Sequence, residues 1–90
     1  MVVYSSVVTV LLHPHARERL LERGATEEEI IATVEHGESF SAKFDRTGFR
    51  RNFAYNREWR GRWFSTKQIE AIAVEENQQW LVITVLVKFF

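Results

Sequence analysis

Residues 80–89 constrain the fold more than any other part of the chain. They predict a long β-strand with two largely apolar faces. One face carries five apolar side chains in unbroken alternation: Leu81, Ile83, Val85, Val87 and Phe89. The other face carries Trp80, Val82, Thr84, Leu86 and Lys88. A strand this apolar on both faces usually lies in the middle of a sheet. The rest of the chain must therefore supply neighbouring strands and a covering layer.

Three more strands are predicted upstream, where apolar and polar residues alternate with a period of two. Phe40, Ala42 and Phe44 indicate the first, with one buried face, and residues 45–48 read as a turn. Phe49, Phe53 and Tyr55 indicate the second, followed by a turn or long loop over residues 56–61. The third runs from Trp63 to Val74 and can bend near Ser65, and residues 75–79 form a polar hairpin turn.

Two short helices are predicted before these strands. The first runs from about Pro14 to Arg23, with Ala16, Leu20 and Leu21 on its apolar side. Proline suits the first helical turn, and Gly24 stands where a left-handed C-cap is common. In the second helix Thr26 is a good N-cap and Glu29 completes a capping box. His36 and Gly37 close this helix.

The apolar segment 7–12 predicts an additional strand at the start of the chain. Helices that come before antiparallel strands indicate the α+β class. We therefore expect one domain over residues 1–90. In it, an N-terminal strand and a two-helix hairpin pack on one face of a four-stranded antiparallel sheet.

The composition suggests where such a protein works. The chain has no cysteine, which excludes a disulfide scaffold and thiolate chemistry. Residues 2–12 are apolar but lack the basic start and the cleavage site of a signal peptide. They are also too short to span a bilayer, which takes roughly 20 apolar residues. We expect a cytoplasmic protein that does not bind a membrane.

Charge is unevenly distributed, although the whole chain has a net charge of zero. The segment 43–67 holds eight basic and two acidic residues, a net charge of +6, so the rest carries −6. This asymmetry favours a basic surface for an anionic partner. The alternative is that these charges only solvate loops and edge strands.

Several short motifs resemble a known family. The first group is His15-Ala16, Arg19, Glu22-Arg23-Gly24 and Glu28-Glu29-Ile30. The second is the run from Lys67 to Ile72, followed by Val82-Ile83-Thr84-Val85. Together they resemble the family catalogued as domain of unknown function number 4258, from about residue 13 to the C-terminus.

That family is thought to be distantly similar to barnase, the colicin E5 and D nucleases and the RelE/ParE-like toxins. The resemblance implies the RelE/barnase-like architecture, metal-free RNA cleavage and a toxin–antitoxin role. The chain departs from the family in two places. The aromatic, arginine-rich run from Tyr55 to Trp63 is an insert, and Leu86 stands where an aromatic residue is common. These departures concern the substrate more than the fold.

Metal-free RNA cleavage needs a base for the 2′-hydroxyl, an acid for the leaving oxygen and cations for the phosphate. His15 is the candidate acid or base, because an unperturbed imidazole titrates near pH 6.5. Arg19 and Arg23 follow on the same helix face and suit a phosphate, and Lys67 and Thr84 complete the candidate catalytic set.

Structural roles compete with each of these assignments. His15 can instead cap the helix, and the arginines can pair with neighbouring glutamates. The apolar side of the first helix must face the sheet, so a site requires His15 at the rim of the sheet. The histidine spacing matches no standard metal motif, and we expect neither a metal nor a cofactor.

The basic segment also interleaves cations with aromatic rings, as in surfaces that bind single-stranded nucleic acid. The candidate binding residues are Arg50, Arg51, Tyr55, Arg57, Trp59, Arg60 and Arg62. RNA and an acidic protein such as a cognate antitoxin are both possible ligands of this surface, since both use aromatic and arginine anchors. A non-catalytic binding module and a small homodimer are the alternatives to an enzyme.

Overall fold

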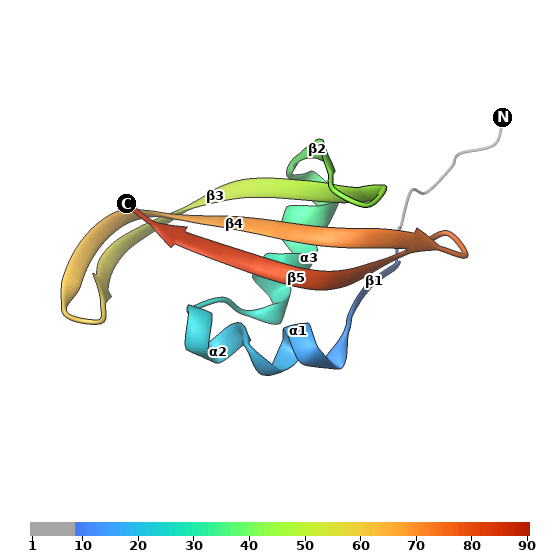
Figure 1. Cartoon of the computed structure of the whole chain (residues 1–90). Helices are drawn as coiled ribbons and strands as arrows, with labels where there is room; N and C mark the ends of the chain where they lie inside the picture. The colour runs from blue at the N-terminus through green and yellow to red at the C-terminus, as the bar shows by residue number, and fades with distance from the viewer. Residues whose placement is uncertain (1–8) are drawn as a thin grey trace, which may run out of the picture.

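The computed structural model describes residues 9–90 and consists of short helices packed on a five-stranded mixed sheet (Figure 1). The strand order is β1-β5-β4-β3-β2. In chain order the elements are β1 (Thr9–Leu12), α1 (Pro14–Glu18), α2 (Leu20–Arg23), α3 (Glu27–His36), β2 (Glu38–Ala42), β3 (Arg46–Trp59), β4 (Arg62–Glu76) and β5 (Gln79–Phe89). The α+β class is confirmed.

The sheet differs from the predicted one in its N-terminal strand. β1 joins the sheet as a fifth strand and runs parallel to β5, while all other neighbours are antiparallel. The two segments are far apart in sequence, so their pairing leaves no local sequence signal. Positions 7 and 8 of the predicted strand lie outside the described residues.

The core lies between the sheet and the helices. Ile69, Ala71 and Ala73 of β4 alternate on the helix-facing side and are completely buried. α3 packs over β3 and β4 with Ile30, while α1 and α2 run alongside β5 with Leu20 buried (Figure 1). The predicted apolar side of the first helix is confirmed for Ala16 and Leu20, but Leu21 is 90% exposed.

The predicted unbroken face of the last strand is wrong, because β5 contains a bulge. Thr84 pairs with Ile72 and Val82 pairs with Ala73, so Ile83 has no partner in the ladder with β4. One extra residue moves every later side chain to the opposite face of the sheet. Val82 and Val85 therefore both point into the core, while Thr84 is exposed.

The predicted first helix is broken at Arg19. Its backbone N–H bonds to the carbonyl of Ala16, three residues back, and its φ and ψ are −92° and −5°. This break separates α1 from α2 and explains why Leu21 points outward. Gly24, with φ of 79°, confirms the left-handed cap, and Thr26 and Glu29 form both bonds of the predicted capping box. No helix within residues 9–90 is long and apolar enough to cross a membrane.

Three predicted turns move or shrink, and the one predicted over residues 75–79 contains only Asn77 and Gln78. The first covers residues 43–45, not 45–48, and the predicted core residue Phe44 is 81% exposed there with φ of 61°. Gly48 lies within β3, where the ring of Phe40 occupies the space of a side chain. The second turn contains only Arg60 and Gly61, because β3 continues to Trp59.

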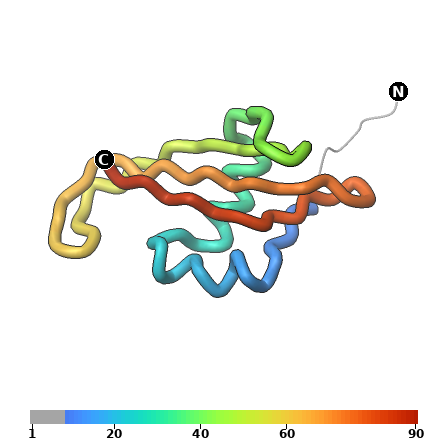
Figure 2. Tube along the Cα trace, viewed as in Figure 1, coloured from blue at the N-terminus to red at the C-terminus, as the bar shows by residue number. Residues whose placement is uncertain are grey.

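A second bulge redirects the β3–β4 hairpin. The register shifts by one residue between Ala54 and Arg57, opposite Ser65, where a bend was predicted. Bulges increase the local twist, and the hairpin curls towards the end of α2 (Figure 2). As a result, Trp59 stacks on Phe89, with ring centroids 5.1 Å apart and an interplanar angle of 18°.

Gly24→Ala should lower stability more than Gly61→Ala. Both glycines have positive φ, so both substitutions strain the backbone by about 1 kcal/mol. Only at Gly24 would the new Cβ also meet the hairpin, 2.9 Å from the Trp59 ring, while at Gly61 it meets nothing within 4 Å. Urea denaturation of both variants measures the difference. Equal losses would show that the hairpin is not packed on Gly24.

Candidate active site and adjoining basic surface

A small pocket opens between α1, α2 and β5. It is lined by His15, Ala16, Arg19, Arg23, Ile83, Thr84 and Val85 and has a volume of about 150 Å³. We call it the helix–strand pocket. The structure thus brings together four of the five predicted catalytic residues, from segments about 60 positions apart in the sequence. Lys67 is not among the lining residues.

The pocket exists because β1 is short. β1 pairs with β5 only as far as Val82, whose carbonyl then accepts a bond of 2.9 Å from the backbone N–H of His13. Beyond Val82, β5 forms an edge of the sheet within the described residues. α1 lies against this edge, so His15 is at the rim that a site requires. His15 itself remains exposed, and its backbone N–H is capped by the imidazole of His13.

The arginines of this pocket are not neutralised by carboxylates. The ion pairs within residues 9–90 join Arg17 to Glu27, Arg50 to Glu70 and Lys67 to Glu29. The predicted competing pairs of Arg19 and Arg23 with glutamates are therefore absent from the described chain. Arg23 is half-buried, and its guanidinium donates to the neutral carbonyl of Val85 across the pocket. Both cations keep their charge available for an anion.

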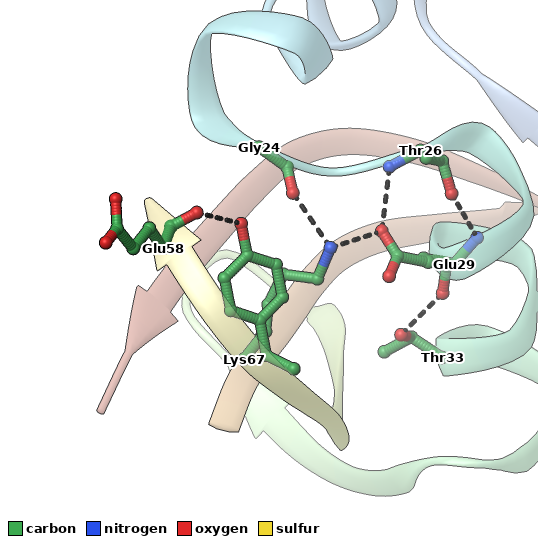
Figure 3. A network of polar contacts seen from close by, with 7 residues as sticks. Gly24, Thr26, Glu29, Thr33, Glu58 and Lys67 are labelled. Atoms are coloured by element: carbon green, nitrogen blue, oxygen red, sulfur yellow. Dashed lines mark hydrogen bonds and ion pairs between the residues drawn. The ribbon is translucent and has the colours of Figure 1, made fainter. Parts of the chain in front are cut away.

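Lys67 has a different environment from the other predicted catalytic residues. It is only 3% exposed, and its ammonium donates to the carboxylate of Glu29 at 2.7 Å and to the carbonyl of Gly24 at 2.9 Å (Figure 3). The ring of Tyr55 lies 5.4 Å from the same nitrogen. Two hydrogen bonds and an aromatic face occupy the ammonium. Lys67 therefore links β4 to the C-cap of α2 and to the first turn of α3.

The sequence contains the signal that places Lys67 inside. It shares the alternation of Ile69, Ala71 and Ala73, which face the core. A charged residue on the apolar side of a strand is expected to be buried with a partner. Lys67 was assigned to the catalytic set because of its positive charge, although its position in the alternation of β4 places it in the core.

The predicted binding residues divide into three places. Arg50 pairs with Glu70 at 3.1 Å on β4. Arg51 lies on the helix side, where its guanidinium donates to the carbonyl of Ala32. The structure therefore separates Arg50 and Arg51 from the other five residues, which lie from the bulge onward at the end of the β3–β4 hairpin, residues 55–64.

The hairpin arginines are exposed and each lies over an aromatic ring. The distances from guanidinium carbon to ring centroid are 4.6 Å for Arg57 and Tyr55, 5.0 Å for Arg60 and Trp59, and 5.6 Å for Arg62 and Phe64. No ion pair within residues 9–90 involves these arginines. The hairpin is thus a cationic surface with aromatic planes, as predicted from its composition.

A second and larger pocket connects the two regions. It is lined by Glu22, Arg23, Trp59, Arg60, Leu86, Val87 and Phe89 and has a volume of about 310 Å³. We call it the hairpin pocket. It shares Arg23 with the helix–strand pocket. Glu22, Leu86, Val87 and Phe89 were not predicted as site residues, because only the curl of the hairpin brings them beside Trp59.

The comparisons with known proteins agree with the resemblance seen in the sequence. A family model described as Domain of unknown function (DUF4258) matches residues 12–87. No curated protein and no solved structure matches the chain. The likeness to the RelE/barnase architecture therefore stays a prediction.

Replacing Lys67 by Met should destabilise the fold by about 3 kcal/mol, because removing one partner of a buried ion pair strands the other charge. Lys67→Met combined with Glu29→Gln should cost less than the sum of the two single variants. The matched control is Arg17→Met, which breaks a pair whose side chains are 59% and 44% exposed and should cost at most about 1 kcal/mol. Urea denaturation gives all four values, and strict additivity would contradict the coupling.

Proposed function

This chain belongs to the family of the Domain of unknown function DUF4258, whose description gives no activity, so we propose a function from the geometry of the chain's own pocket. The proposed function is metal-independent cleavage of RNA. One observation carries the proposal. His15, Arg19, Arg23 and Thr84 line a single pocket of about 150 Å³. Pockets for whole small molecules are usually larger, roughly 300–1,000 Å³. The helix–strand pocket has space for a phosphate group and its immediate substituents.

The lining residues supply the groups that cleavage by 2′-hydroxyl attack needs. The His15 imidazole takes the proton of the 2′-hydroxyl, whose oxygen then attacks the adjacent phosphorus. Arg19 and Arg23 stabilise the charge that builds on the phosphate oxygens, and the Thr84 hydroxyl donates a hydrogen bond to one of them. The bond to the 5′-oxygen breaks, and that oxygen takes a proton from water. The products are a 2′,3′-cyclic phosphate and a 5′-hydroxyl.

Arg23 is suited to this role by its present partner. A guanidinium bonded to a neutral carbonyl forms a stronger hydrogen bond when a phosphate replaces that carbonyl, because hydrogen bonds between charged groups are roughly twice as strong as neutral ones. The backbone carbonyl of Val85 meanwhile holds Arg23 over the pocket. Lys67 has no part in this chemistry, since its ammonium is buried against Glu29.

A second candidate function is non-catalytic binding of nucleic acid by the hairpin. It is favoured by the exposed guanidinium groups of Arg57, Arg60 and Arg62, each held over a ring. Cations follow the phosphates of a single strand, while aromatic faces stack on bases. An acidic protein such as an antitoxin would meet the same cations. The two candidates are compatible, because the hairpin pocket adjoins the helix–strand pocket.

RNA incubated with the protein and a chelator should be cut to cyclic-phosphate ends. His15→Ala should slow this cleavage by at least about 100-fold, the usual contribution of a general base. Arg19→Ala should slow it as well, because a phosphate contact is lost. Gel analysis of end-labelled RNA measures both rates.

The chain offers a matched control for each variant. His36→Ala removes an exposed histidine at the end of α3, and Arg17→Ala removes an exposed arginine of α1 that is outside the pocket. Both should leave the cleavage rate unchanged. The proposed chemistry would be wrong if RNA stayed intact, or if His15→Ala cut it as fast as the native chain.

Nucleic-acid binding by the hairpin predicts a specific salt dependence. In a His15→Ala background, replacing Arg57, Arg60 and Arg62 by Ala should reduce the slope of log K against log salt by about 2 for single-stranded RNA. Replacing Arg17, Lys43 and Arg46 removes the same number of charges elsewhere and should change the slope much less. Fluorescence anisotropy at several salt concentrations measures both. Equal changes would show that the hairpin has no special role.

A further inference from the structure

The hairpin pocket has properties that a phosphate site does not need. At about 310 Å³ it is twice as large as the helix–strand pocket and falls in the usual size range of ligand sites. Val87 and Phe89 line it from the core-facing side of β5, Leu86 lines it at the edge of that strand, and the indole of Trp59 adds an aromatic surface. A planar apolar group fits this lining better than an ion does.

The charged residues of the pocket point to the same kind of ligand. Arg23 and Arg60 are cationic, whereas Glu22 carries the one carboxylate among the lining residues. That carboxylate repels a phosphate inside the pocket but accepts hydrogen bonds from N–H groups. Nucleobases combine a planar ring with N–H donors and have phosphates on either side. The arginines can then contact those flanking phosphates.

We infer that the hairpin pocket binds the base of a nucleotide beside the cleaved bond, so that the substrate is single-stranded RNA. This inference rests on the proposed cleavage site in the helix–strand pocket, which lies across Arg23 from it. A base in a duplex is paired and stacked and is not free to enter a side pocket. An acidic peptide is the less suitable occupant, because Glu22 opposes its carboxylates.

The pocket is held in shape without a ligand. The guanidinium of Arg60 donates to the backbone carbonyl of Glu22 at 2.6 Å, which fastens the hairpin to α2. On the other side, Trp59 stacks on Phe89. A preformed site spares the ligand the cost of ordering the hairpin. Base binding can therefore add to the affinity that the phosphate contacts provide.

The experiment uses hexanucleotides in which one ribonucleotide interrupts a deoxyribonucleotide strand, so that only one bond can be cut by its 2′-hydroxyl. Two further versions lack the base on either the 5′ or the 3′ side of that bond. One abasic version should be cut about tenfold more slowly, as expected when one stacked base is lost. The same strand in a duplex should be cut more slowly as well.

Two variants test whether the hairpin pocket is responsible. Trp59→Ala removes the indole from the lining of the pocket, and Arg60→Ala releases the hairpin from α2. Both should cut the intact hexanucleotide about as slowly as the native chain cuts the abasic one, with no further loss on that abasic strand. Arg46→Ala is the control on β3, outside the pocket, and should cut all strands like the native chain. Thermal melting of each variant shows that it is folded.

The outcomes separate this inference from the proposed function. Equal cleavage of the intact and both abasic strands, or of single and double strands, overturns the base pocket while cleavage stands. If no strand is cut, the proposed function fails, and binding of a fluorescein-labelled hexanucleotide decides the base pocket. Trp59→Ala should then weaken binding about tenfold. The base pocket is overturned if this variant binds with unchanged affinity. It is also overturned if a polyglutamate peptide displaces the labelled strand and an unlabelled hexanucleotide does not.

Discussion

The ion pair between Lys67 and Glu29 is the constraint on which the arrangement of both pockets depends. Burying an ammonium is costly unless its hydrogen bonds are satisfied. Here the carboxylate of Glu29, in the first turn of α3, and the carbonyl of Gly24, the C-cap of α2, satisfy it. The same carboxylate oxygen also accepts from the N-cap amide of Thr26. One buried charge thus fixes the start of α3 and the end of α2 over the centre of the sheet.

The position of α2 in turn determines where cations collect. Arg23 reaches β5 from the last turn of α2. Because Gly24 has no side chain, the Trp59 ring of the curled hairpin can pack against it. Two bulges complete the arrangement, one at Ile83 and one beside Asn56. The first exposes Thr84 while keeping Val85 in the core, and the second turns the hairpin towards α2. Without the first bulge, strand alternation from Val82 would turn Thr84 into the core and Val85 away from it.

Local patterns predicted the parts of this fold that depend on neighbouring residues. The capping box at Thr26, the C-cap at Gly24 and the hairpin turn before β5 are all encoded within a few positions. The bulge at Ile83 was not predictable, because side chains on both faces of that strand are apolar and a shift of one residue leaves the pattern unchanged. The parallel β1–β5 pair and the edge it leaves open come from contacts about 70 positions apart. The catalytic candidates were named individually, but the hairpin pocket depends on those long-range contacts.

The way in which the arginines are held separates structural charges from available ones. Arg17, Arg50 and Lys67 meet carboxylates, whereas Arg23 and Arg60 donate to backbone carbonyls and the hairpin arginines lie over rings. Carbonyls and rings orient a guanidinium without neutralising it. Arg19, Arg23 and Arg60 therefore keep their charge at the two pockets beside β5, where Glu22 is the only opposing charge among the lining residues. A polyanion that enters these pockets meets cations already oriented, so little side-chain ordering opposes its binding.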